Sequence, residues 1–211
     1  MTYQPDQSQL NALATWYPTD SPLHLDPRHP AIKLAGEAGE ILDCFGKHEY
    51  KPNFDWMQCK NCSKIHPSTP PGWANMCPEY TPLIMDELGD YSYYLRILAY
   101  QKGISFEELC KPYSEVNNKL WYSNDDLLEL LSDLYSTSGK VLSSYLETNN
   151  IWTGKLTDCA LYFLAILDNL DIKLQNVLDL NYKKLNSEPS NHGWRSAKMK
   201  TIDDCPPMNP K

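Results

Sequence analysis

The stretch "LAGEAGEILD", residues 34 to 43, is the one from which the rest of the sequence is best interpreted. It has the pattern of a helix and places Glu37 and Glu40 three residues apart, between apolar residues such as Leu34 and Ile41. Residues three apart lie on one face of a helix. We therefore expect both carboxylates on the inward face, where something must compensate their charges.

A second long helix is expected in "TPLIMDELGDYSYYLRILAYQKG", residues 81 to 103. Thr81 can cap its N-terminus, and Gly103 can adopt the left-handed conformation that ends helices. Glu87 and Asp90 repeat the spacing of the first pair, again among apolar side chains. If the two helices pack antiparallel, the four carboxylates converge.

Four converging carboxylates favour a divalent cation, because uncompensated they would cost several kcal/mol in repulsion and lost hydration. Oxygen-only ligands with room for water suit Mg²⁺ best and Mn²⁺ next. A solvated acidic face is the alternative for any single pair. The expected Mg²⁺ ligands are Glu37, Glu40, Glu87 and Asp90. The adjacent acids Asp43 and Asp86 are expected to be supporting or surface residues.

Composition narrows the class of protein. The chain has 211 residues and a formal net charge of -8, without clusters of Lys and Arg, so duplex nucleic acid is not an expected partner. No apolar run approaches the ~18 residues that cross a bilayer, and the N-terminus does not resemble a secretion signal. We expect a cytoplasmic protein that does not bind membranes.

Helical periodicity extends over most of the chain, and no convincing strand pattern is present, so the expected fold is all-α. Ser105 and Glu108 form a capping box, and Pro112 should kink the helix that follows. In the first half the expected helices are residues 6–17, 30–45, 82–102 and 105–121, the second of them beginning near Pro30 and ending at Gly46.

The second half repeats this plan. Residues 34–43, 87–98 and 103–109 align in order with "LYSTSGKVLS" (134–143), "KLTDCALYFLAI" (155–166) and "DIKLQNV" (171–177). Glu37, Glu40 and Glu87 become Thr137, Lys140 and Lys155, while Asp90 remains acidic as Asp158. Chance similarity between amphipathic helices is the alternative. We predict two tandem repeats, a catalytic one at 1–123 and a degenerate one at 124–186 that packs on it, followed by a tail at 187–211.

The first repeat carries a small Cys-rich insertion at residues 46–80. Its spacing is Cys59-x2-Cys62-x3-His66-x10-Cys77, which suits a structural Zn²⁺ site with three thiolates and one imidazole. A second Cys pair is missing, so His48 or Cys44 is an alternative fourth ligand. A loop with free thiols is the competing interpretation.

The motifs Glu37-x-x-Glu40 and Glu87-x-x-Asp90, in the contexts "GEAGEIL" and "DELGDYSYYL", resemble those of the MazG-like all-α NTP pyrophosphohydrolase superfamily, which includes the dimeric dUTPases. The resemblance covers about residues 30 to 122. It implies a helical bundle in which the four acids bind Mg²⁺, and hydrolysis of a nucleoside triphosphate to the monophosphate and pyrophosphate. Members often work as dimers of helical units, so a tandem repeat can form an intrachain pseudo-dimer, with a homo-oligomer also possible.

The resemblance also suggests substrate contacts. The family tends to carry Asn-x-Lys on its last helix, matched here by Asn117 and Lys119, but the Arg expected one turn later is missing. Lys33 or Arg195 can supply that charge. In this scheme the metals polarise the phosphoryl oxygens and lower the pKa of a bound water, which Glu40, or failing that Glu37, deprotonates. Aromatic residues that can stack on a base are more often core residues, and none receives a role: Trp16, Tyr17, Tyr93, Tyr94 and Trp121.

The sequence thus predicts a Mg²⁺-dependent nucleoside triphosphate pyrophosphohydrolase. Two alternatives remain. A catalytically weak nucleotide-binding sensor is consistent with the missing Arg, and a zinc-dependent protein-interaction module is consistent with the Cys-rich insertion.

Overall fold

The computed structural model describes residues 3–49, 81–115 and 127–187. Within these ranges the chain is entirely helical, which confirms the all-α prediction. The helices are α1 (Gln7–Leu13), α2 (Arg28–Glu49), α3 (Thr81–Gln101), α4 (Phe106–Glu115), α5 (Leu127–Thr148), α6 (Thr153–Asn169) and α7 (Leu174–Ser187). None of the described helices is long and apolar enough to cross a membrane.

Local signals predicted some helix ends and missed others. The capping box at α4 is present, with the Glu108 amide donating to Ser105 Oγ over 3.0 Å and the Ser105 amide donating to Glu108 Oε2 over 3.1 Å. Gly46 does not end α2, which continues to Glu49. A glycine inside a helix costs only about 1 kcal/mol, which flanking residues can offset.

The first helix is shorter than expected because the chain turns after Leu13. The amides of Thr15 and Trp16 donate to carbonyls three residues back rather than four, which tightens the chain out of the α-helix. The Trp16 indole then donates to the His24 carbonyl over 3.1 Å and anchors the loop that leads to α2.

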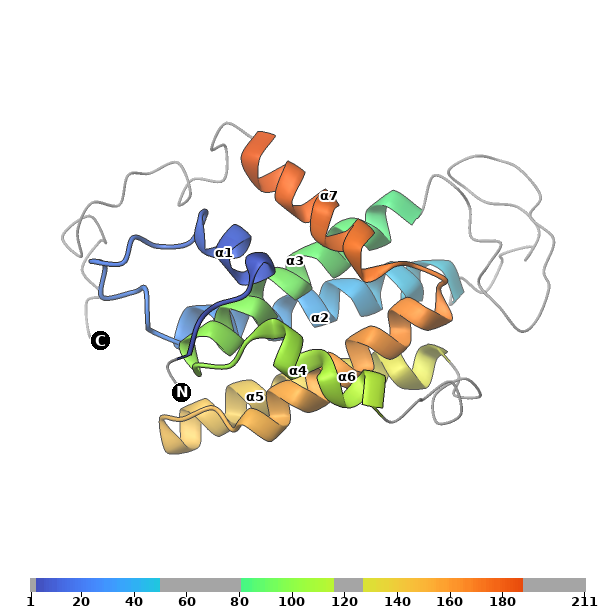
Figure 1. The fold of residues 1–211 in the computed structure, drawn as a ribbon. Helices are drawn as coiled ribbons and strands as arrows, with labels where there is room; N and C mark the ends of the chain where they lie inside the picture. Colours follow the sequence, from blue (N-terminus) through green and yellow to red (C-terminus); the bar gives the residue numbers. More distant parts are fainter. Residues whose placement is uncertain (1–2, 50–80, 116–126, 188–211) are drawn as a thin grey trace, which may run out of the picture.

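Helix α3 lies at the centre, between α2 and α7 (Figure 1). Helix α5 packs on α2, and α6 packs on α3, α4 and α5. Helices α2 and α3 are antiparallel, because Lys33 lies 5.9 Å from the ring of Tyr94 whereas Glu37, further along α2, meets Glu87, earlier on α3. Helices α2 and α5 also pack closely, and Tyr135 of α5 covers Gly39 of α2.

The last helix of each predicted repeat, α4 in the first and α7 in the second, packs on the other half of the chain. Helix α4 contacts α6 more than α3, and α7 packs on α3. Tyr113 of α4 donates a hydrogen bond to Asp168 Oδ2 of α6 over 2.6 Å. The two halves are therefore interlocked rather than placed side by side.

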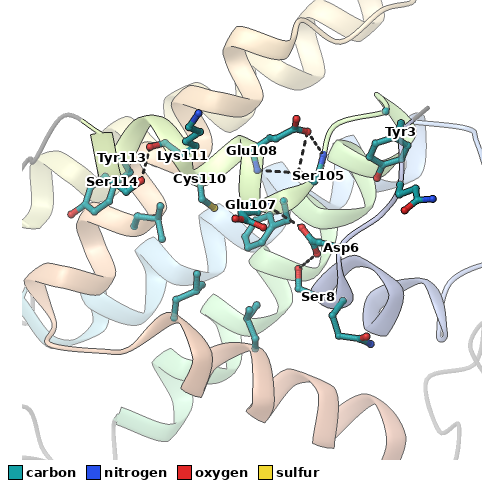
Figure 2. Close-up of a pocket in the computed structure, with 17 residues that line it drawn as sticks. Tyr3, Asp6, Ser8, Ser105, Glu107, Glu108, Cys110, Lys111, Tyr113 and Ser114 are labelled. Atoms are coloured by element: carbon teal, nitrogen blue, oxygen red, sulfur yellow. Dashed lines mark hydrogen bonds between the residues drawn. The ribbon is translucent and has the colours of Figure 1, made fainter. Parts of the chain in front are cut away.

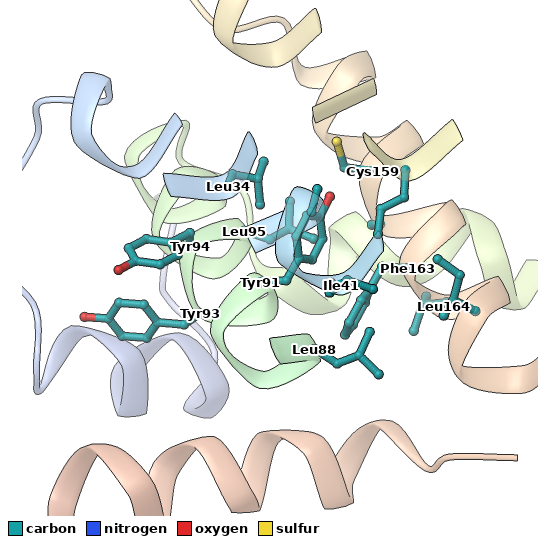
Figure 3. Packing of buried hydrophobic residues seen from close by; sticks show 14 of the residues in the cluster. Leu34, Ile41, Leu88, Tyr91, Tyr93, Tyr94, Leu95, Cys159, Phe163 and Leu164 are labelled. Atoms are coloured by element: carbon teal, nitrogen blue, oxygen red, sulfur yellow. The ribbon is translucent and has the colours of Figure 1, made fainter. Parts of the chain in front are cut away.

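The core lies where α2, α3 and α6 meet, and Figure 3 shows side chains from all three helices pointing into it. Leu34 and Ile41 come from α2, Leu88 from α3, and the rings of Tyr91 and Phe163 stack with centroids 5.6 Å apart. Full burial of each such side chain contributes about 1.5–3 kcal/mol. This packing fixes α2 against α3, and with it the positions of the acidic residues they carry.

The alignment of the two repeats matches the turn after α3 with the turn after α6, and these two turns have the same geometry. Gly103 after α3 and Asp171 after α6 both adopt the left-handed conformation, with φ of 69° and 54°. The next amide donates back to the last turn in each case, from Ile104 to Ala99 O (3.0 Å) and from Ile172 to Leu167 O (2.8 Å).

Burial follows the same alignment. Over residues 31–42 and 131–142, the order of buried, half-buried and exposed residues agrees at every position except Ala35 and Tyr135. These likenesses bear on the tandem repeat, which remains a prediction.

Candidate metal centre

Three of the four predicted acids converge at the contact between α2 and α3. Glu37, Glu40 and Glu87 each offer a carboxylate oxygen, and the three oxygens lie within 4.8 Å of one another. The antiparallel packing of the two helices brings the pairs together, as their spacing predicts.

The three acids differ in exposure. Glu37 is buried, with 5% of its surface exposed, Glu87 is half-buried and Glu40 is exposed. The expectation that both acids of α2 lie on its inward face is therefore wrong for Glu40. Three residues advance a helix by about 300°, so Glu40 is rotated by about 60° from Glu37 and reaches the rim of the cluster.

Burial and mutual repulsion raise the pKa of two of these carboxyls. Loss of hydration raises the pKa of Glu37 from 4.5 to about 7, assisted by the charge of Asp90 and opposed by Lys33. Loss of hydration and the charge of Glu40 raise the pKa of Glu87 to about 7 as well. A cation bound at the cluster would therefore favour the charged form of both carboxyls.

Asp90 lies beside this group and is held from the other side by α7. Its Oδ1 accepts a hydrogen bond from Asn181 Nδ2, and its Oδ2 accepts one from Lys184 Nζ, each over 3.0 Å. Lys184 Nζ also lies 2.8 Å from Asp86 Oδ1, so Lys184 links Asp86 to Asp90. Each carboxylate oxygen of Asp90 keeps acceptor capacity for a further partner.

Sequence reasoning missed the roles of Asn181 and Lys184. They lie three apart on a helix, which indicates a shared face, but nothing in the local pattern shows that α7 crosses to α3.

Lys33, a predicted substrate contact, lies beside Glu37. Its Nζ is 3.5 Å from Glu37 Oε1, and the Lys33 side chain is 40% exposed. The ammonium group partly offsets the charge of Glu37 and remains accessible to an anion.

The matching position in the second half has a different chemistry. Thr137 is buried where Glu37 is buried, and Lys140 is exposed where Glu40 is exposed. Lys155 forms an ion pair with Asp158, with Nζ and Oδ2 3.1 Å apart. At this position a lysine therefore offsets the one of the four acids that the second half retains.

Several predicted site residues lie outside the described residues: Cys59, Cys62, His66 and Cys77 of the zinc motif, Asn117, Lys119, Trp121 and Arg195. Of the alternative zinc ligands, Cys44 is half-buried on α2, and His48 belongs to the last turn of that helix. Trp16, Tyr93 and Tyr94 are 6%, 0% and 2% exposed, so they are core residues rather than a wall for a base.

An open groove between α1, α4 and α7 lies apart from the acidic cluster and does not include any of its three glutamates (Figure 2). Asp6 lies at its edge and accepts hydrogen bonds from the amides of Gln9 and Glu107, at the N-termini of α1 and α4. Burial alone would raise the pKa of Asp6, but hydrogen bonds from Ser8, Gln9 and Glu107 lower it. Asp6 thus joins two helices.

Comparison of the chain with family models, with curated proteins and with solved structures found no match. The motifs and the geometry of the acidic cluster therefore carry the functional argument.

Proposed function

We propose that the protein is a Mg²⁺-dependent nucleoside triphosphate pyrophosphohydrolase of the MazG-like type, which releases the monophosphate and pyrophosphate. The observation that carries the proposal is the convergence of Glu37, Glu40 and Glu87 from two antiparallel helices, with Asp90 beside them. The motif resemblance of these four residues supplies the reaction class.

The donor set fits a hard divalent cation, because every converging atom is a carboxylate oxygen and one edge of the cluster is open at Glu40. Loss of hydration, and then the charges of neighbouring acids, raise the pKa values of Glu37 and Glu87 although Lys33 and Lys184 oppose the shifts. When bound, Mg²⁺ supplies charge for the phosphate oxygens and lowers the pKa of a coordinated water.

The other roles in the reaction are assigned to side chains of the protein. Glu37, Glu87 and Asp90 are assigned to hold the cation, and Glu40, at the exposed rim, to accept a proton from water at its carboxylate oxygen. Glu37 is the second choice for that proton. Lys33, which is partly exposed beside Glu37, is assigned to a phosphate oxygen of the substrate.

The tandem repeat belongs to this proposal. It is supported by the matching turns at Gly103 and Asp171, by the shared order of buried and exposed residues in α2 and α5, and by the exchange of α4 and α7. In this view the second half is a pseudo-dimer partner that keeps only one of the four acids, as Asp158, but still supplies α7 to the site. The zinc site at residues 59–77 remains a proposal from sequence spacing.

The test is pyrophosphate release from a panel of ribo- and deoxynucleoside triphosphates with Mg²⁺, for the parent and for Glu40→Gln. The substitution keeps the shape of Glu40 but removes its charge, so we expect turnover to fall by at least about 100-fold with little change in stability. Asp43→Asn is the matched control, because Asp43 is an exposed acid on the same helix that is not one of the three converging acids.

Equal turnover of Glu40→Gln and the parent at limiting Mg²⁺ would remove Glu40 from the site. Nucleotide binding without any turnover by the parent would favour the sensor alternative instead.

A further inference from the structure

Arg96 of α3 is buried, with 2% of its surface exposed, and it donates to uncharged acceptors. Its Nε donates to the Ser92 carbonyl (3.1 Å), Nη1 to the Ser8 carbonyl (2.9 Å) and Nη2 to Asn181 Oδ1 (3.0 Å). Burial lowers the pKa of this guanidinium from 12.5 to about 10. A buried charge is costly to keep, and apolar side chains of similar size often stabilise such interiors equally well.

Asn181 of α7 connects this charge to the acidic cluster. Its side chain is also 2% exposed, and its Nδ2 donates to Asp90 Oδ1 over 3.0 Å. A guanidinium can only donate hydrogen bonds, so it fixes the amide oxygen of Asn181 toward Arg96. The amide NH₂ must then face Asp90.

The backbone is shaped for this contact. A Cβ atom at Gly89 of α3 would lie 3.1 Å from Asn181 Cβ, closer than side chains normally allow. The absence of a side chain at Gly89 lets α7 approach until the amide of Asn181 bridges Arg96 and Asp90.

We propose that Arg96, acting through Asn181, is a positioning residue that fixes the Asp90 carboxylate for cation binding. The inference deepens the proposed function and rests on it. Asn181 occupies one acceptor site of Asp90 Oδ1, which restrains rotation of the carboxylate while its remaining lone pairs stay available. Hydrogen bonds of this kind to ligating carboxylates typically change metal affinity by about 10- to 100-fold.

The test measures binding of Mn²⁺ alone to the full chain by calorimetry, so it does not depend on turnover. We expect Arg96→Met and Asn181→Leu each to weaken Mn²⁺ binding by about tenfold. Because both substitutions act through one amide, the double variant should bind Mn²⁺ no more weakly than Asn181→Leu alone. Ser92→Ala is the control: Ser92 is buried on the same helix, its hydroxyl donates to the Gly89 carbonyl, and the substitution keeps the backbone carbonyl that accepts from Arg96. It should bind Mn²⁺ like the parent even where its melting temperature falls.

If Asn181→Leu does not melt cooperatively, Asn181→Ser replaces it, because the shorter side chain cannot bridge Arg96 and Asp90. Any folded variant at Asn181 that binds Mn²⁺ as tightly as the parent overturns the inference. Parent turnover with unchanged Mn²⁺ affinity in the variants would refute the inference alone. If the variants bind Mn²⁺ more weakly than the parent but the parent does not turn over nucleotides, the proposed function alone is refuted.

Discussion

At the scale of single residues, Glu37 and Glu87 differ from ordinary surface acids because the fold holds them where their charges are poorly hydrated. Their carboxyl groups sit opposite each other on two helices whose packing is fixed by the apolar core. The folded state therefore carries an electrostatic cost that is absent from the unfolded chain, first from lost hydration and then from mutual repulsion. A cation or a proton can relieve it.

This electrostatic cost predicts how stability depends on pH in chelator-treated protein. The pKa of each group is about 7 when folded and 4.5 when unfolded, so the folded state binds protons more tightly. The stability that protonation gives is fully present below about pH 4.5 and is lost as pH rises through 7. Since solvent screens half-buried Glu87, we expect the free energy of unfolding to fall by on the order of 3 kcal/mol between pH 5 and pH 8.

Urea unfolding at a series of pH values measures this dependence. Glu37→Gln should flatten the profile, whereas Glu129→Gln, at an exposed position on α5, should leave it unchanged. Millimolar Mg²⁺ should raise stability at pH 8 more than at pH 5, because protons and cations compete for the same oxygens. A parent that is most stable at pH 8 without metal would contradict the argument.

At the scale of helices, the sequence predicted the features that depend on neighbouring residues, such as helix caps, turns and the spacing of acids on one face. Ser105 and Glu108 form their capping box, Gly103 is left-handed, and the antiparallel contact of two ExxE-type faces brings Glu37 to Glu87. The exposure of Glu40 and the contribution of α7 were not predictable in this way. They depend on how far a helix is rotated and on which neighbour it packs against, which are consequences of packing across the whole chain.

Two glycines provide a matched test of helix packing. Gly89→Ala places a methyl group 3.1 Å from Asn181 Cβ and should force α7 away from α3, at a cost of about 1–3 kcal/mol. Gly36→Ala, on the exposed face of α2 with nothing within 4 Å, should stabilise the helix by roughly 0.5–1 kcal/mol. Chemical denaturation of both variants measures the two effects. Similar changes in both would show that α7 does not pack tightly at Gly89.

At the scale of the whole molecule, the exchange of α4 and α7 makes each half depend on the other. Helix α4 has most of its contacts with α6, and α7 covers α3 beside the acidic cluster. Asn181 and Lys184 of α7 illustrate this dependence, because they contact Arg96 and Asp90 of α3. In the proposed pseudo-dimer, the second half can therefore carry Thr137 and Lys140 in place of acids and still be needed by the first half.

The same dependence predicts the behaviour of a fragment that ends at residue 123. It keeps α1 to α4 but lacks the α6 surface on which α4 packs and the α7 helix that covers α3, so two apolar faces are uncovered. We expect this fragment to dimerise or aggregate, measured by size-exclusion chromatography with light scattering.

A fragment ending at residue 187, which keeps α7, serves as the control and should match the parent in assembly state and melting temperature. A monomeric 1–123 fragment as stable as the parent would refute the interdependence of the two halves.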